Sequence, residues 1–162
     1  MGEDLCLDTA YTRTLEEGSH ILKIEDIQQT KLVEIGWRFN QSYYGGHIGA
    51  QMIMHCLANR YKSGWGPWLD IIAKVPQFMA ENELPELTFP NQWDGNFVKV
   101  LHLVSGVFDG SIPDLSKGAL YWADLNHIER PWFKSRIVDP IKENGQREHP
   151  IVATINSLTF FR

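Results

Sequence analysis

Cysteine is scarce in this chain, and it has no long hydrophobic run. Its 162 residues include two cysteines, Cys6 and Cys56, without CxxC spacing. We therefore expect free thiols rather than a disulfide. No apolar run approaches the roughly 18 residues of a membrane span. The acidic start at residues 1–6 lacks the apolar core of a signal peptide. The sequence thus predicts neither a membrane partner nor a secretory signal.

Positive charge is also in short supply. Lysine and arginine together number 15 against 20 aspartates and glutamates, which gives a net charge of −5. Because nucleic-acid phosphates are bound by a clustered basic face, we expect no nucleic-acid partner. The hydrophobic share of 43% and the charged share of 22% are typical of a globular domain.

Several catalytic motifs are missing as well. The chain has no HExxH, and its six histidines are scattered, so zinc ligands cannot be assembled. It has no GxSxG elbow, no recognisable cysteine nucleophile and no glycine-rich phosphate cradle. These absences favour a glycan-cleaving or noncatalytic role over peptide-bond hydrolysis. We expect no metal and no cofactor.

The patterns that are present predict an α+β domain. Residues 1–20 are polar and unpatterned, which indicates an N-terminal arm, and residues 21–162 form one domain. Apolar residues at helical spacing and helix-start signals predict helices over 21–39, over 47–61, from Pro67, and from a cap at Asp94 to Phe108. Residues 118–123 and 151–161 are typical of strands. Helices first and strands last predict a helical half of three to four helices and a small antiparallel sheet.

Four short segments carry a family resemblance. In chain order they are Ala58–Arg60, Gln77–Phe78, Asp114–Trp122 and Ile155–Phe161. Their order and separations resemble the spore-cortex-lytic cell wall hydrolases (SleB/CwlJ type), over roughly residues 30–162. The resemblance implies a lysozyme- or transglycosylase-like fold and cleavage of the glycan strands of peptidoglycan, the expected partner.

The catalytic acid is the point at which the family pattern is hardest to fit. Family members carry a glutamate at the end of the first helix, and Glu34 is the nearest residue of that type. More residues separate Glu34 from Asn59 than separate the catalytic glutamate from the corresponding position in family members. A fit without a gap places Gln41 at the position of the catalytic glutamate. Leu158 stands where family members usually have histidine. Either departure is compatible with lost catalysis.

The chemistry implied by the resemblance needs one carboxylic acid. In a lytic transglycosylase this acid protonates the departing glycosidic oxygen. The C6 hydroxyl of N-acetylmuramic acid then attacks the anomeric carbon of its own ring. Hydrolysis of the usual kind needs a second carboxylate. The acid has to stay protonated, so it belongs in an apolar setting that raises its pKa. Apolar neighbours of Glu34 in the sequence allow such a setting, whereas Lys31 and Arg38 allow an ordinary ion pair.

Four further residues are expected to contact the substrate. Gln77 occupies a family position suited to an acetamido sugar, and an exposed loop amide is the alternative. Tyr121 and Trp122 point to opposite faces of a strand, so one is available to stack on sugar while the other packs inward. His55 shares a polar helix stripe with Asn59, and a solvated face is the alternative there.

Two noncatalytic interpretations stay open. One is a structural or tail-associated virion module that kept the hydrolase fold and lost its acid, with other virion proteins as partners. The other is a module that grips wall sugars without cutting them. If the chain degrades the cell wall, the lack of an export signal indicates that a bacteriophage encodes it. We then expect the chain in the host cytoplasm before lysis or in the virion.

Overall fold

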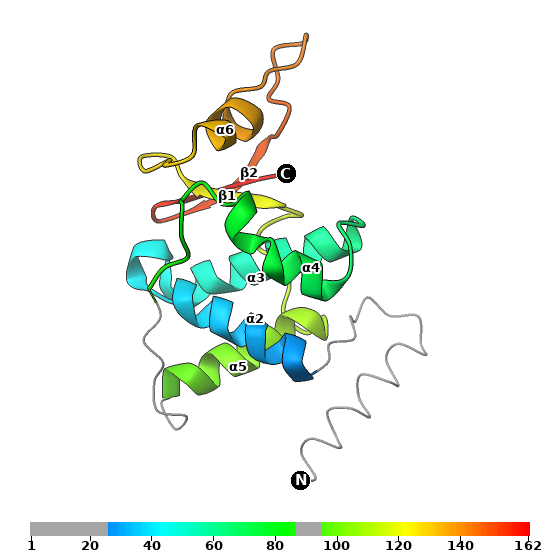
Figure 1. Cartoon of the computed structure of the whole chain (residues 1–162), viewed down its shortest axis with the longest axis vertical. Coiled ribbons are helices and arrows are strands. Elements are labelled where there is room, and N and C mark those ends of the chain that lie inside the picture. The colour runs from blue at the N-terminus through cyan, green and yellow to red at the C-terminus, as the bar shows by residue number, and fades with distance from the viewer. Residues whose placement is uncertain (1–25, 87–94) are drawn as a thin grey trace.

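A helical layer and a small sheet make up the described part of the chain, residues 26–86 and 95–162 of a computed structural model (Figure 1). The elements are α2 (Asp26–Phe39), η1 (Ser42–Tyr44), α3 (Gly46–Lys62), α4 (Trp68–Ala73), η2 (Val75–Phe78), α5 (Gly95–Phe108), β1 (Tyr121–Asp124), α6 (Pro131–Phe133), η3 (Lys134–Val138), β2 (Ile151–Ile155) and β3 (Leu158–Phe161). The predicted α+β class is confirmed.

Helix α3 is the centre of the helical layer. It packs against α2, α4 and α5, and Ala50, Ile53, Met54 and Leu57 on it are fully buried. Its burial reaches almost all round the helix, including Gln51 and His55. A helix buried on most sides is typical of a core element rather than a surface one.

The sheet has the strand order β1-β3-β2 and is antiparallel throughout. Trp122 of β1 pairs with Phe160 of β3, and both belong to the core shared with the helices. The opposite face carries Phe161, which packs with Phe133 and Ile137 of the α6–η3 segment. The sheet is therefore covered on both faces, by the helical layer and by α6 with η3 (Figure 1).

The structure corrects two details of the predicted strands. Residues 151–161 were expected to form one strand, but they fold as the hairpin β2–β3. The turn falls at Asn156, whose φ of 46° lies in the left-handed region, and asparagine tolerates that region better than most residues. The polar segment between the predicted strands also contains α6 and η3, because Pro131 begins a helical turn that buries Phe133.

The helix predicted over residues 21–39 begins at Asp26 among the described residues. The arm at residues 1–20 and the cap at Asp94 lie outside them.

Candidate functional site

The structure brings three of the four family-like segments together around the end of α3. Asn59 Nδ2 donates hydrogen bonds to Asp114 Oδ2 and to the carbonyl of Ala119, both at 3.0 Å. Arg60 Nε donates to the carbonyl of Leu120 at 2.8 Å. The guanidinium of Arg60 also lies 5.7 Å from the ring of Phe78. The side chains at the end of α3 thus hold the segment that leads into β1.

Asp114 is the acceptor at the centre of this arrangement. Besides Asn59, it accepts hydrogen bonds from the backbone N–H and the hydroxyl of Ser116 and from the N–H of Gly118. Burial by itself would raise the pKa of Asp114, but these hydrogen bonds outweigh it and hold the pKa below its ordinary value. The carboxylate is therefore a structural brace for the loop before β1.

Replacing Asp114 with alanine is expected to lower the free energy of unfolding by about 2–3 kcal/mol, because several donors lose a charged acceptor. Since the pKa is depressed, this stability is present above the unfolded-state pKa of an aspartate and is lost as pH falls through the folded-state pKa. Urea unfolding at a series of pH values measures both effects. Asp139→Ala is the control, since it removes an exposed ion pair with Lys134, and we expect less than about 1 kcal/mol. Equal losses in the two variants would contradict the role of Asp114.

Arg60 is almost fully buried, with 1% of its surface exposed, among aromatic rings. Its guanidinium carbon lies 4.9 Å from the ring centre of Trp65, 5.0 Å from Trp122 and 5.8 Å from Tyr121. Burial lowers the pKa of Arg60 to about 10, so the side chain remains a cation at neutral pH. Cation–π attraction to these rings offsets part of the cost of burying that charge.

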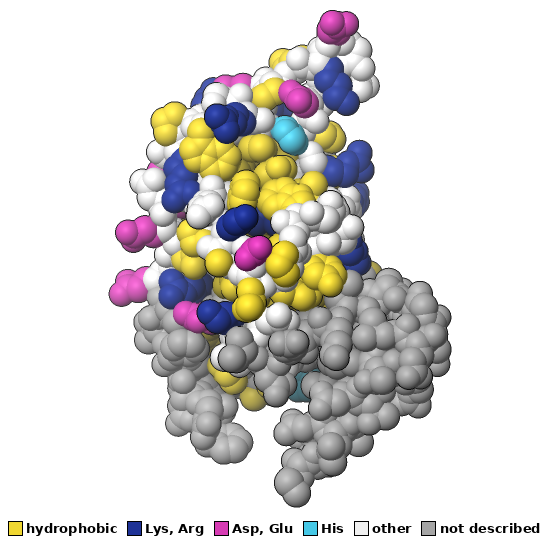
Figure 2. Space-filling view, turned by 45° about the vertical axis from the view of Figure 1, so that its right-hand side comes forward, with side chains coloured by type: hydrophobic (Ala, Val, Ile, Leu, Met, Phe, Trp, Pro, Cys, Tyr) yellow, Lys and Arg dark blue, Asp and Glu magenta, His cyan; other side chains and the backbone are white. Residues whose placement is uncertain are grey.

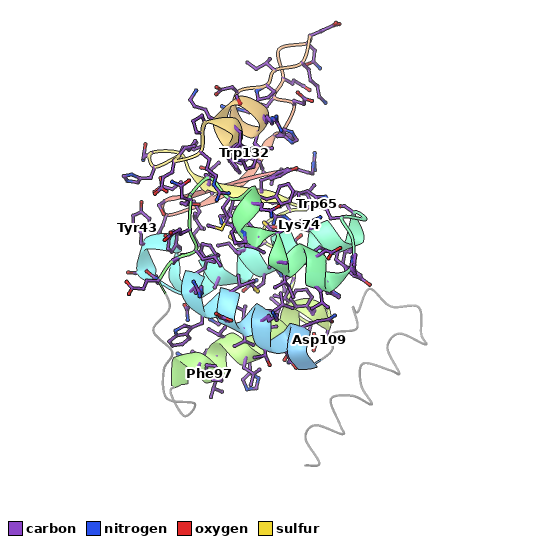
Figure 3. All side chains as sticks on the ribbon, viewed as in Figure 1. Tyr43, Trp65, Lys74, Phe97, Asp109 and Trp132 are labelled. Carbon is purple, nitrogen blue, oxygen red and sulfur yellow. The ribbon has the colours of Figure 1, made fainter. Side chains whose placement is uncertain are left out.

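A cavity of about 230 Å³ opens beside this cation. Its lining is Arg60, Trp65, Ile71, Lys74, Phe78 and Tyr121. In Figure 3, Trp65 and Lys74 lie close to each other on the side of the molecule that carries α4. Figure 2 turns this side toward the viewer and shows hydrophobic side chains gathered across it, with lysine and arginine among them. We call this cavity the arginine pocket.

The predicted substrate contacts on β1 and η2 are placed differently from one another. Tyr121 is partly exposed and lines the arginine pocket. Gln77 is exposed on η2, directly before Phe78 of the pocket lining. The prediction for Trp122 is wrong, because its side chain is fully buried against Phe39 and Arg60 and presents no surface to a substrate.

His55 lies inside α3 rather than on a solvated face. Its side chain is 5% exposed, and its Nδ1 is 3.9 Å from Asp114 Oδ1. Burial lowers the pKa of His55, and the charge of Asp114 opposes this only in part. We therefore interpret His55 as a buried packing residue next to the carboxylate of Asp114. It does not reach the arginine pocket lining.

Glu34 has the surroundings of an ordinary ion pair. Its carboxylate accepts a hydrogen bond at 3.2 Å from Arg38, one turn further along α2, and its side chain is 36% exposed. Arg38 also donates to the carbonyl of Pro85. A solvent-accessible ion pair is not the apolar setting that the catalytic interpretation of Glu34 requires.

The two positions that depart from the family pattern both lie near the far end of β1. Gln41 lies just before η1, and its carbonyl accepts the N–H of Tyr44 at 2.9 Å. Leu158 is fully buried and pairs with Asp124 across the sheet. The resemblance would put an acid at Gln41 and a histidine at Leu158, and both positions lie near the end of β1 that carries Asp124.

A group of ionisable side chains that sequence patterns did not indicate surrounds this place. The hydroxyl of Tyr43 donates a short hydrogen bond to Asp124 Oδ2, and the N–H of Asn126 donates to Oδ1 at 3.0 Å. Asp124 is 2% exposed. Glu81 is partly buried, and its Oε2 is buried without a hydrogen-bond partner. We call Tyr43, Glu81 and Asp124 the acidic site.

The surroundings raise the pKa of two members of the acidic site, Glu81 and Tyr43. Burial raises the pKa of Glu81, and the charges of Asp124 and Glu129 raise it further, while a hydrogen bond from the backbone of Glu81 itself and the charge of Arg130 oppose them. The hydrogen bond to Asp124 raises the pKa of Tyr43 to about 12, although the side chain of Tyr43 is exposed. Tyr43 stands on the opposite side of the molecule from Trp65 and Lys74 in Figure 3, so the acidic site and the arginine pocket are separate.

Two other cavities have different linings. One of about 150 Å³ lies between α2 and α5. A shallow one of about 530 Å³ lies by the loop at residues 141–147, and its lining includes Lys142, Arg147 and Arg162. Across residues 26–86 and 95–162, His, Cys, Asp and Glu form no group of three or more that could hold a metal ion. No helix within those ranges has the length and apolar character to cross a bilayer.

Comparison of the chain with protein-family models, with curated proteins and with solved structures gave no match.

Proposed function

We propose that this chain cleaves the glycan strands of peptidoglycan as a lytic transglycosylase, and that Glu81 rather than Glu34 is the acid. The observation that carries the proposal is the environment of the Glu81 carboxyl. It is partly buried, has one oxygen without a hydrogen-bond partner, and has a raised pKa beside Asp124. A carboxylic acid held neutral by burial and a nearby carboxylate is the pattern expected of a general acid.

The location of the acidic site supports the same proposal. Gln41 and Leu158, the positions at which the family-like pattern would place its acid and its histidine, both lie beside Tyr43 and Asp124. An acid supplied from the segment after η2 would restore the chemistry that Gln41 cannot provide. No sequence pattern indicated Glu81, because it belongs to a loop segment with no motif.

In the proposed reaction Glu81 first donates a proton to the substrate and later accepts a proton from it. Glu81 donates its proton to the glycosidic oxygen as the bond from that oxygen to the anomeric carbon breaks. The C6 hydroxyl of the same N-acetylmuramic acid then bonds to the anomeric carbon, and its proton passes to the Glu81 carboxylate. The products are a 1,6-anhydro sugar and a free hydroxyl on the leaving strand, and the enzyme returns to its starting state.

Asp124 supports the single-acid route over hydrolysis. A hydrolase needs its second carboxylate to act on water or as a nucleophile. Both oxygens of Asp124 accept hydrogen bonds, from Tyr43 and from Asn126, and the side chain is 2% exposed. An acceptor so engaged positions Tyr43 and raises the pKa of Glu81, and it is poorly placed to activate water.

Product analysis tests the proposal. Purified peptidoglycan is digested with the wild-type chain, and the soluble products are read by mass spectrometry. We expect muropeptides that end in 1,6-anhydro-muramic acid, and the same products from Glu34→Gln, because Glu34 lies in a surface ion pair. Products with reducing ends would overturn the single-acid route, and loss of products in Glu34→Gln alone would restore Glu34 as the acid.

A noncatalytic virion module is the second candidate. Gln41 and Leu158 favour it, because both stand where the family-like pattern has ionisable groups. Such a module would contact other virion proteins, and it would release no product from any wall type. For either candidate the chain belongs in the host cytoplasm before lysis or in a phage particle, and it acts at the cell wall.

A further inference from the structure

Among the described residues, the guanidinium of Arg60 has no anionic partner. Its Nε hydrogen bond goes to the neutral carbonyl of Leu120, and its Nη2 is buried without any hydrogen-bond partner. None of the three ion pairs found in residues 26–86 and 95–162 includes it. Buried cations are ordinarily paired with an acceptor or a carboxylate. The aromatic rings around Arg60 offset part of this deficit, but they accept no conventional hydrogen bond.

The cavity beside Arg60 is suited to supply the missing anion. Its lining contains two cations, Arg60 and Lys74, and no carboxylate. Arg60 lies at the buried end, with 1% exposure, whereas Lys74 is exposed to solvent. Two cations that line one cavity, one deep and one at the surface, make a favourable site for a carboxylate that enters from outside.

The rest of the lining is aromatic and apolar. Trp65, Phe78 and Tyr121 are each partly exposed, so their ring surfaces are accessible to a ligand. Aromatic faces stack on sugar rings and other flat apolar bodies. The volume of about 230 Å³ is below the 300–1,000 Å³ of pockets that enclose whole drug-sized ligands, so the cavity accepts one charged group and part of the ring that bears it.

We propose that the arginine pocket is a binding site for a carboxylate attached to a sugar ring, with the carboxylate on Arg60 and Lys74 and the ring on Tyr121 and Trp65. In a glycan strand this sugar would be a muramic acid unit whose stem peptide has been removed, because the peptide otherwise holds the lactyl carboxyl as a neutral amide; this identification rests on the proposed function. The anion site itself rests only on the pocket. Its lining shares no residue with the acidic site, and Tyr43 of that site lies on the opposite side of the molecule from Trp65 and Lys74 (Figure 3).

The test is direct binding by isothermal titration calorimetry with a matched pair of sugars. N-acetylmuramic acid and N-acetylglucosamine differ by a lactyl ether that carries the carboxylate. We expect saturable binding of N-acetylmuramic acid, and binding of N-acetylglucosamine at least about tenfold weaker, because the charge-assisted hydrogen bonds are lost. Equal affinity for the two sugars, or no binding of either, would overturn the proposal.

Free D-lactate separates a carboxylate site from a site for a carboxylated sugar. We expect lactate to bind at least about tenfold more weakly than N-acetylmuramic acid, because it lacks the ring that the aromatic residues contact. Lactate affinity equal to that of N-acetylmuramic acid would overturn the sugar part of the proposal.

Two variants locate the site. Lys74→Ala changes an exposed side chain, so it should fold normally and bind N-acetylmuramic acid several-fold more weakly, whereas the exposed Lys31→Ala should bind as the wild type does. Arg60→Met should abolish binding, and a thermal unfolding scan checks that it is folded. Unchanged affinity in Lys74→Ala and in folded Arg60→Met would contradict the assignment. Binding of the free monosaccharide is measured by calorimetry and cleavage of the glycan strand by its products, so failure of the catalytic proposal and failure of this one are distinguishable.

Discussion

Replacing Glu81 with glutamine is expected to reduce the rate of glycan cleavage by about 10²–10⁴-fold, the usual contribution of a general acid. Glutamine keeps the shape of the side chain but cannot donate the proton. Wild-type cleavage should decline as pH rises through the raised pKa of Glu81, since the reaction needs the protonated form. The measurement is the rate of release of soluble muropeptides from purified peptidoglycan across a pH series.

The same substitution is expected to preserve or increase stability, which separates an acid from a structural residue. Because burial raises the folded-state pKa of Glu81, its contribution to stability is fully present below the unfolded-state pKa of a glutamate and is lost as pH rises through the folded-state pKa. Glutamine is neutral at every pH. At neutral pH, Glu81→Gln should therefore have a free energy of unfolding equal to or above that of the wild type.

Glu83→Gln is the matched control, because Glu83 is exposed in the same segment two residues away. It should retain wild-type activity at all pH values. Full activity in Glu81→Gln would rule out Glu81 as the acid. Loss of activity together with loss of stability would assign Glu81 a structural role.

Replacing Gly49 with alanine is expected to destabilise the domain by about 3 kcal/mol or more, in the upper part of the range for overpacked sites. A Cβ at this position would lie 1.7 Å from the carbonyl oxygen of Tyr44. That oxygen is backbone, so relief requires η1 to move away from α3. The expected fall in melting temperature is roughly 6–12 °C for a domain of this size, measured by thermal unfolding.

The consequence reaches the acidic site because η1 carries Tyr43. The side chains of Asn156 and Ser157 donate hydrogen bonds to the carbonyls of Ser42 and Tyr43, which tie η1 to the β2–β3 turn. Displacing η1 should pull Tyr43 from Asp124 and reduce cleavage even below the melting temperature.

Gly95→Ala is the control for the Gly49 variant. No atom of the described residues lies within 4 Å of a Cβ added at Gly95, so we expect a change within about 0.5 kcal/mol. Alanine is intrinsically the better helix former by about 1 kcal/mol. A Gly49→Ala protein as stable as the wild type would therefore show that moving η1 costs only about 1 kcal/mol, which would contradict the prediction.

Local patterns were sufficient for the helices that face the core. Apolar residues at helical spacing predicted residues 47–61, and α3 spans Gly46–Lys62. They also predicted a helix that ends at Phe108, where α5 ends. Each pattern reports which face of one element avoids water, and this is a property of neighbouring residues. The hairpin within 151–161 was missed because its turn depends on one asparagine, without the glycine that usually marks a turn.

The candidate site depended on contacts between distant residues. Tyr43 and Asp124 are separated by 81 positions, and Arg60 and Leu120 by 60. No local pattern distinguishes Glu81 from the exposed Glu83, or the ion-paired Glu34 from a buried acid. These glutamates differ in the solvent exposure of the carboxyl and in the charges around it. Both properties arise only when the chain has folded.

The sequence by itself therefore determined the α+β class, the helical layer, and the absence of motifs for metal, phosphate or nucleophilic chemistry. The tertiary structure decided which residues are chemically distinctive. Within the described residues it buried Trp122 and His55, paired Glu34 with Arg38, left the guanidinium of Arg60 without an anion, and placed Glu81 where burial and the charge of Asp124 raise its pKa. The physical reason is that helix and strand formation follow from short-range periodicity and backbone preference, whereas pKa and ligand affinity follow from desolvation and from charges that long-range packing brings together.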